Sequence, residues 1–176
     1  MKEYTINTKD LRDFSSVLCA GDKIYLSGTV YTARDAAHKR IFELIDKKEP
    51  LPFKIENSVI YFAGPTPTPE GLAIGSCGPT TSCRMDSFTP TLHDMGLVAT
   101  IGKGDRNTEV IDSIKRNNAV YLCAIGGAGA LAAMSITECK VIAFEDLGCE
   151  SVKKLEFKDF PLIVGIDSKG RNIFTR

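Results

Sequence analysis

The feature of this sequence that most constrains its fold is a repeated alternation of strand-like and helix-like segments. Residues 23–31 are rich in β-branched and aromatic residues, and residues 33–47 carry apolar side chains at helical spacing. Further strands are expected at 58–63, 97–102, 119–125, 139–145, 152–158 and 161–167, and further helices at 88–96, 107–117 and after the glycine-rich turn beyond residue 125. Because the last strands follow too closely for helical crossovers, we predict an α/β fold with a mixed β-sheet.

Length and charge narrow the class of protein. The 176 residues suit one compact domain, and no repeat or linker divides them, so we expect a single domain over residues 1–176. Twenty-two basic and 22 acidic side chains cancel, whereas nucleic-acid binding needs a basic excess, so we expect no nucleic-acid partner. The sequence shows no signal-peptide pattern and no run of the ~20 apolar residues that a membrane span requires. We therefore expect a cytoplasmic protein without a membrane partner.

The cysteines do not follow the spacing of a metal site. None of the six forms a Cys-x-x-Cys pair, and the chain has two histidines. Zinc sites and iron–sulfur clusters need tighter, recurring ligand spacing. We expect no metal ligands on this chain and reduced, mostly buried cysteines.

An arginine at the start of the first long helix is the first candidate ligand contact. The segment TARDAAHKR, residues 32–40, directly follows a strand, and Thr32 and Asp35 are spaced as a capping box with Thr32 as N-cap. Arg34 then falls in the first helical turn, where the helix dipole disfavours a cation. An anion held by the free backbone N–H groups and the guanidinium would account for this placement.

A second segment repeats this design. GSCGPTTSCRMD, residues 75–86, combines flexible glycines, hydroxyl groups that include Thr80 and Thr81, and Arg84 near a helix start. Two matched arginines would suit the two carboxylates of one small substrate, although pairing with acids of the chain itself would also explain each arginine. Lys103, between glycines at a strand end, is a third candidate anion contact.

These motifs resemble those of a known family. GTVYTARDAAHKR (28–40), GPTTSCRMD (78–86) and the later GKG and GGAGAL segments resemble the C-terminal region of class I fumarate hydratase, or the separate β subunit of its two-subunit form. The similarity covers essentially the whole chain. It implies a swivelling β/β/α fold and reversible hydration of fumarate to L-malate. The β subunit of L-tartrate dehydratase is similar in the same segments and is the alternative.

The resemblance also implies a division of labour. In the family, an α portion holds a four-iron four-sulfur cluster on three cysteines, and the β portion supplies substrate-binding and proton-transfer groups. Carried over to this chain, Arg34 and Arg84 look like the arginines that bind the dicarboxylate, and Thr80 looks like a proton-transfer residue. Thr81 and Lys103 look like further substrate contacts. The chain would be active only with its α subunit, in an α2β2 assembly or with a β–β contact.

Two neighbours of these motifs are assigned lesser roles. We expect Cys83 to be a small buried filler. His38 lies one helical turn after Arg34, so we expect it either to support the site from behind or to lie on the surface, and an acid–base role is the alternative.

Two other classes of function are considered. Gly127, Gly129 and Ala132 fit a Gly-x-Gly-x-x-Ala nicotinamide-binding pattern after a strand, with Glu145 as the ribose-binding acid. This pattern leaves the arginine segments unexplained, and a tight glycine turn would produce it as well. The remaining alternative is a module that binds dicarboxylates without turning them over.

Overall fold

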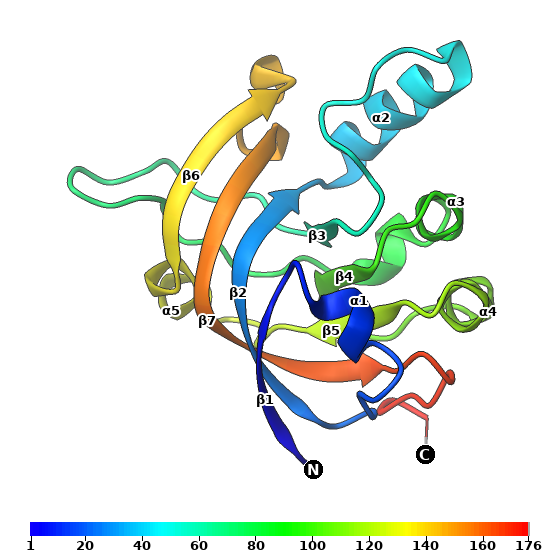
Figure 1. Cartoon of the computed structure of the whole chain (residues 1–176). Coiled ribbons are helices and arrows are strands. Elements are labelled where there is room, and N and C mark those ends of the chain that lie inside the picture. Colours follow the sequence, from blue (N-terminus) through cyan, green and yellow to red (C-terminus); the bar gives the residue numbers. More distant parts are fainter. Residues whose placement is uncertain (176) are drawn as a thin grey trace.

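The computed structural model describes residues 1–175, and Figure 1 shows their arrangement. The elements follow in the order β1 (Glu3–Asn7), α1 (Leu11–Phe14), β2 (Lys23–Thr32), α2 (Asp35–Lys47), β3 (Val59–Tyr61), η1 (Ser82–Met85), α3 (Thr89–Asp94), β4 (Ala99–Gly102), α4 (Thr108–Arg116), β5 (Val120–Cys123), α5 (Gly129–Met134), β6 (Ile136–Ala143), η2 (Glu145–Glu150) and β7 (Val152–Ile166). The predicted α/β class with a mixed sheet is confirmed.

The sheet closes on itself. The strand order is β1-β2-β3-β4-β5-β7-β6, and an additional pairing joins β2 to β7. Strands β2, β3, β4 and β5 run parallel, whereas β7 pairs antiparallel with both β2 and β5. These five strands therefore form a closed, barrel-like ring, and β1 and β6 extend it on the outside.

Closure depends on the length of β7. We expected separate strands at 152–158 and 161–167, but the 15 residues of β7 form one continuous strand. Asp159 takes a positive φ of 49° at the middle of this strand. The strand can thus pair with β6 near its start, with β5 near its end and with β2 along most of its length. The short edge strand β1 was not predicted.

Side chains along β3 alternate between two apolar cores. In β3, Val59 and Tyr61 belong to the core inside the ring, whereas Ile60 and the following Phe62 pack outside it, against α2 and α3. This two-residue period is the normal geometry of a strand with both faces covered. Both faces of β3 are therefore buried.

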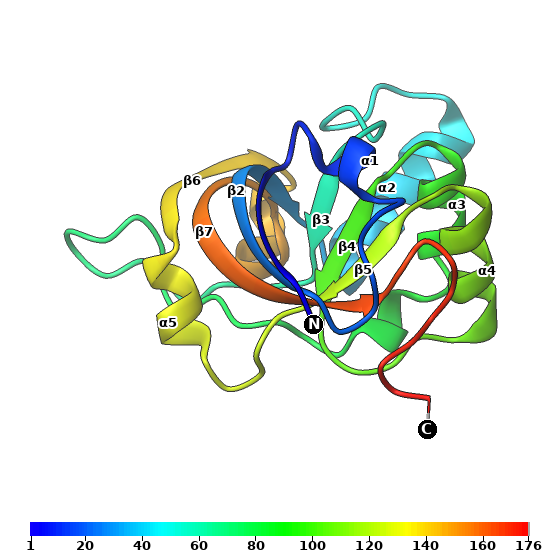
Figure 2. The same ribbon diagram turned by 60° about the horizontal axis from the view of Figure 1, so that its bottom comes forward.

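The helices divide between two sides of the ring. Helices α2, α3 and α4 lie along one side, whereas α5 and the long 64–78 segment lie beyond β6 and β7 on the opposite side (Figures 1 and 2). The α5 end and the 64–78 segment are joined by a hydrogen bond from the Cys77 N–H to the Gly129 carbonyl (3.0 Å). No helix within residues 1–175 has the length and apolar character needed to cross a membrane.

The start of α2 differs from the prediction. Thr32 is not its N-cap but the last residue of β2, where its hydroxyl accepts a hydrogen bond from the Lys153 N–H (3.0 Å). The helix begins at Asp35, so Arg34 occupies the N-cap position and makes no side-chain cap. Arg34 therefore lies at the strand-to-helix junction itself and not within the first turn.

The cysteines also differ from the prediction. Cys77 is buried, but Cys83 and Cys149 are exposed and the others are partly exposed. Cys83 points out of the short helix η1, on the same turn as buried Ser82 and Met85. The expectation that Cys83 is a small buried residue is therefore wrong.

Candidate functional site

The predicted site residues gather where parallel strands end. Arg34 follows β2, and Lys103 follows β4 directly. The segment between them is held at the same edge, because the Thr80 N–H donates to the Phe62 carbonyl (2.7 Å) and the Ser82 N–H to the Lys103 carbonyl (2.9 Å). Ligands of α/β sheets commonly bind outside the carboxyl ends of the strands.

Arg84 is held by Asp35, the first residue of α2. Arg84 Nε donates to Asp35 Oδ1 at 3.0 Å, and Arg84 Nη2 lies 3.0 Å from Asp35 Oδ2. The second contact is an ion pair without hydrogen-bond alignment, which leaves Oδ2 without a hydrogen bond. The carboxylate thus contacts the side of the guanidinium formed by Nε and Nη2.

Arg34 lies beside the same carboxylate and beside a second acid. Its Nη2 is 3.8 Å from Asp35 Oδ2 and 3.5 Å from Glu150 Oε1. Glu150 also accepts a hydrogen bond from the Ala36 N–H at 2.9 Å. The start of α2 therefore already holds a carboxylate of this chain, and the expected free N–H groups at that terminus are partly used.

Both arginines nevertheless keep free donors. Arg34 Nε is buried without a hydrogen-bond partner, and within residues 1–175 Nη1 and Nη2 of Arg34 make no hydrogen bond, Nη2 taking part only in ion pairs. The Arg84 side chain is 49% exposed, and within residues 1–175 its Nη1 has no hydrogen-bond or ion-pair partner. Because both Nη2 atoms approach Asp35 Oδ2, the two guanidinium groups are neighbours. The geometry gives two adjacent cations that can still donate to a ligand.

The backbone of Arg34 is fixed by His38. The Nδ1 atom of His38 lies 2.9 Å from the Arg34 carbonyl, and because a carbonyl only accepts, Nδ1 is the donor. The ring is fully buried and stacks on Phe88 with centroids 5.3 Å apart. Burial lowers the pKa of His38 to about 4, although the contact with the carbonyl opposes this change. Of the two placements expected for His38, the buried one behind Arg34 is found.

A glycine leaves room for the Arg34 side chain. A Cβ atom at Gly64 would lie 3.1 Å from Arg34 Nη1 and 3.2 Å from both Arg34 Cδ and the Cys149 carbonyl oxygen. Gly64 follows β3, so two strand ends, those of β2 and β3, and the segment before β7 meet around this arginine. A larger residue at position 64 would displace the guanidinium.

Thr80, Thr81 and Lys103 lie at the same edge of the sheet, and together with Arg34 and Arg84 they form the rim of the candidate site. Thr81 and Lys103 are paired in a parallel β-bridge. The Lys103 side chain passes over Gly126, where a Cβ would lie 3.3 Å from Lys103 Cδ. Within residues 1–175 neither threonine hydroxyl has a protein hydrogen-bond partner, so both are free to contact a ligand. No group that could activate Thr80 as a base contacts it among these residues.

A buried ion pair behind the rim was missed in the sequence. Arg106 Nε donates to Asp86 Oδ1 at 2.6 Å, and its other nitrogens donate to Thr100 (3.1 Å) and Thr89 (2.7 Å) hydroxyls. Asp86 also accepts from the Asn107 N–H (2.8 Å). This network ties the Arg84 segment to the Lys103 segment. The sequence shows this network only as the segment DRN at 105–107, and nothing in that segment indicates that Arg106 is buried.

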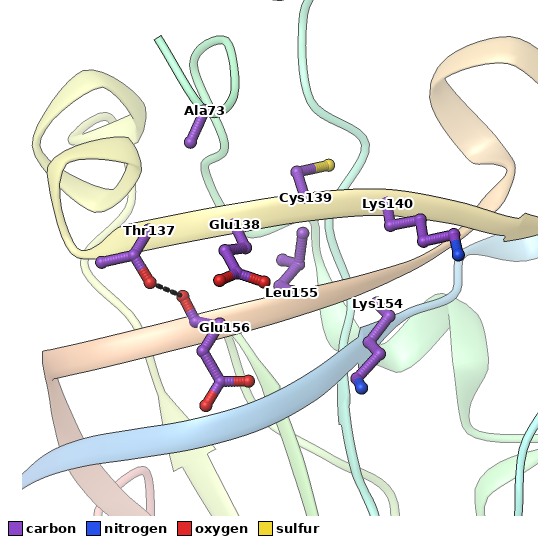
Figure 3. A pocket seen from close by; sticks show the side chains of 8 residues that line it. All are labelled: Ala73, Thr137, Glu138, Cys139, Lys140, Lys154, Leu155 and Glu156. Atoms are coloured by element: carbon purple, nitrogen blue, oxygen red, sulfur yellow. Dashed lines mark hydrogen bonds between the residues drawn. The ribbon is translucent and has the colours of Figure 1, made fainter.

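A separate hollow lies on the outer part of the sheet. About 430 Å³ in volume, it is lined by β6, β7 and Ala73, and Figure 3 shows Glu138 and Glu156 in one part of it and Lys140 and Lys154 in another. None of the predicted site residues lines it. Because it lacks these residues, we do not assign the site to it.

The described residues offer no metal site. Residues 1–175 contain no group of three or more His, Cys, Asp or Glu side chains placed to hold a metal ion. A four-iron four-sulfur cluster therefore does not fit the donor groups found on this part of the chain.

The nicotinamide-binding pattern does not form the unit that it requires. Gly127 and Gly129 lead into α5, a helix of six residues. The next strand, β6, is separated from β5 by β7, and Glu145 lies beyond β6 in η2. A dinucleotide fingerprint needs two adjacent parallel strands with the acid at the end of the second strand. The glycines are better explained by close packing, because Gly129 lies against Gly78.

Comparison with known proteins matches the entire chain. The family described as Fumarase C-terminus matches residues 1–176. Fumarate hydratase 2 of Leishmania major is 43% identical over 89% of this chain, and the aerobic class I fumarate hydratase of Escherichia coli is 41% identical over 86% of it. The chain spans only 28% of the length of each. The L(+)-tartrate dehydratase subunit beta of Escherichia coli is 35% identical over 96% of this chain and 83% of that subunit.

Proposed function

Because the chain belongs to the Fumarase C-terminus family, we propose that it is the β subunit of an iron–sulfur-dependent hydro-lyase that reversibly hydrates fumarate to L-malate. On this proposal it supplies substrate-binding and proton-transfer groups, and a companion α subunit completes the site. The relatives that are named as fumarate hydratases and as a tartrate dehydratase subunit support this class of activity.

The observation that carries the proposal is the pairing of Arg34 and Arg84 around Asp35. Two neighbouring guanidinium groups with unused donors suit the two carboxylates of a short diacid. A site with a single arginine would hold one carboxylate and leave the other end of the substrate free to rotate.

The proposed roles follow from this geometry. Arg34 and Arg84 would fix the diacid and stabilise the negative charge that develops on a carboxylate when the adjacent carbon loses its proton. Thr81 and Lys103 would contact the substrate from the other part of the rim. Thr80 would transfer the carbon proton, and since a threonine is a weak base, its activating group would come from the companion chain.

The companion is proposed on two grounds. The tartrate dehydratase relatives are named as subunit beta, which implies a partner subunit, and the residues described here do not form a cluster site. We therefore assign the four-iron four-sulfur cluster to the α subunit and derive no step of this chain through it. The rim is also open, with Arg84 half exposed, so a covering surface would be needed to exclude water from the substrate.

Two finer points belong to the same proposal. The closed ring with flanking helices would act as the swivelling β/β/α domain of such an enzyme, moving as one domain against its companion. L-tartrate is the alternative substrate, since the Escherichia coli tartrate dehydratase subunit matches most of this chain along most of its own length.

The test is reconstitution of the pair. The chain and its α subunit are co-expressed and purified without oxygen, and hydration of fumarate and dehydration of L-malate and L-tartrate are measured. We expect turnover by the pair and none by either chain alone. Arg84→Ala should lower kcat/KM by about two to three orders of magnitude, because a charge-assisted contact to the reacting carboxylate is lost.

The control is Arg116→Ala, which removes an exposed arginine paired with Asp94 on α3. It should leave kcat/KM unchanged. Turnover of none of the three acids by the cluster-loaded pair, or near-normal turnover by Arg84→Ala, would refute the proposed function.

A further inference from the structure

The contact between Asp35 and Arg84 has a definite orientation. Asp35 contacts Arg84 through Nε and Nη2, at 3.0 Å each. This arrangement leaves the other edge of the guanidinium, formed by Nη1 and the outer N–H of Nη2, without a partner among residues 1–175. Two parallel N–H groups on that edge match the two oxygens of a carboxylate.

Asp35 itself is held rigidly. It is the first residue of α2, and its side chain is 27% exposed. The next residue, Ala36, donates its N–H to Glu150 at 2.9 Å, which fixes this end of the helix to the segment before β7. The side chain of Arg84, by contrast, is 49% exposed and projects from the short helix η1. Without a partner, a long side chain in this position would sample many rotamers.

From this geometry we infer that Asp35 is a positioning residue, which clamps Arg84 from the side so that its outer edge is presented to a substrate carboxylate. The inference rests on the proposed function for the identity of that carboxylate. Asp35 does not touch the substrate. It acts through Arg84, and its 3.8 Å contact with Arg34 keeps the two guanidinium groups at a fixed spacing.

An opposite role for Asp35 makes a different prediction. If its carboxylate occupied the place of a substrate carboxylate, it would compete with the substrate, and neutralising it would strengthen binding. The side-on contact argues against competition, because it uses the edge of Arg84 that a substrate does not need. A purely structural role would change the stability of the fold and leave the KM of correctly folded enzyme unaltered.

The kinetic test uses Asp35→Asn in the reconstituted pair. Asparagine has the same shape and can keep the hydrogen bond to Nε, but it loses the charge and turns an NH₂ group toward the guanidinium. We expect KM for the dicarboxylate to rise about tenfold or more, with kcat changed much less, because a small displacement of a binding group is costly. The matched control is Asp146→Asn, which removes the negative charge from the exposed Arg40–Asp146 pair between α2 and η2 and should leave KM unchanged.

A double-mutant cycle tests whether Asp35 acts through Arg84. In an Arg84→Lys background the side-on contact no longer exists, so Asp35→Asn should add little to the rise in KM. Additive effects of the two changes would overturn the inference, as would a lowered KM in Asp35→Asn, or an unchanged KM together with a lowered melting temperature.

A second measurement does not depend on activity. The rotation of the Arg84 guanidinium can be followed by nitrogen-15 NMR on this chain of 19.2 kDa. We expect the Arg84 guanidinium to rotate slowly in the wild type and fast in Asp35→Asn. The rotation of the Arg40 guanidinium should change only in Asp146→Asn. Fast rotation of Arg84 in the wild type would overturn the inference. Slow rotation in a pair that turns over no diacid would instead leave the clamp intact and refute the proposed function.

Discussion

At the scale of single residues, the candidate site depends on how its cations are compensated. Arg34 and Arg84 share Asp35, and Glu150 supplies a second negative charge beside Arg34. Two arginines and two acids give a neutral cluster, which avoids the cost of placing like charges together. The incoming diacid would therefore bind by using spare N–H donors and not by filling an uncompensated positive pocket.

The space around Arg34 gives the first prediction. Gly64→Ala should raise KM for the dicarboxylate and lower the free energy of unfolding by about 1 kcal/mol, because the added Cβ crowds Arg34 and the Cys149 carbonyl. Gly64→Val should have the larger effect on both quantities. Steady-state kinetics and urea unfolding measure them, and a valine variant with unchanged KM would contradict the placement of Arg34.

The two buried histidines give a pH prediction. Burial lowers the pKa of His38 to about 4 and that of His93 to about 3, from an ordinary value of 6.5. Below pH 6.5 the two histidines therefore bind protons in the unfolded chain, whereas in the folded chain they stay neutral until a lower pH. Stability is full above pH 6.5 and should fall as the pH drops toward 4, by up to about 1.4 kcal/mol per pH unit for each histidine.

Urea unfolding at a series of pH values measures this slope. His38→Asn keeps an N–H that can reach the Arg34 carbonyl but has no titrating group, so its slope between pH 6 and 4.5 should be shallower than that of the wild type. An equal slope in the two proteins would show that His38 is not buried in its neutral form.

At the scale of elements, the site residues lie at strand-to-helix junctions. The sequence predicts the strands and helices on either side of these junctions better than the junctions themselves. The periodic segments of β2, α2, β4 and α4 were placed closely, since burial of a regular face leaves a clear pattern. The capping box at Thr32 was wrong because β2 continues to that residue and uses its hydroxyl in the ladder to β7. Such a tertiary contact competes with local capping and leaves no local signal.

The link between two of these elements gives a prediction of stability. Asp86→Asn should cost about 3–5 kcal/mol of unfolding free energy, because it leaves the buried Arg106 cation without its partner. Asp94→Asn is the matched control, since its pair with Arg116 is half exposed, and it should cost less than about 1 kcal/mol. Similar losses in both variants, measured by chemical unfolding, would mean that the Asp86–Arg106 pair does not hold the two site segments together.

At the scale of the whole molecule, ring closure sets which strand ends face one another. The sequence predicted a mixed sheet but neither its strand order nor its closure by β7, because pairings between residues more than a hundred positions apart leave no local pattern. The grouping of Arg34, Arg84, Thr80, Thr81 and Lys103 on one rim is a consequence of that topology. The roles of these residues in catalysis stay predictions.

The face next to the rim predicts where the companion subunit docks. Ile125, Leu131 and Met134 are 66%, 68% and 81% exposed, and the Gly126 turn beside them contacts Lys103. An exposed apolar face beside an open site suits the docking of the proposed companion subunit. Leu131→Glu and Met134→Glu should each weaken assembly about tenfold or more and leave the isolated chain folded.

Calorimetric titration of the two subunits measures this affinity. Val17→Glu is the control, because this exposed residue follows α1, and α1 lies apart from α5 (Figures 1 and 2). Equal affinities for all three variants would place the companion on another face.

The central claim is that Arg34 and Arg84 hold one diacid between them. A crystal structure of the assembled protein with a saturated four-carbon dicarboxylate, which cannot be hydrated, tests it most directly. The account predicts one carboxylate on the outer edge of Arg84 and the other within hydrogen-bonding distance of Arg34, with Asp35 still beside both. A bound diacid that contacts neither guanidinium would contradict the account.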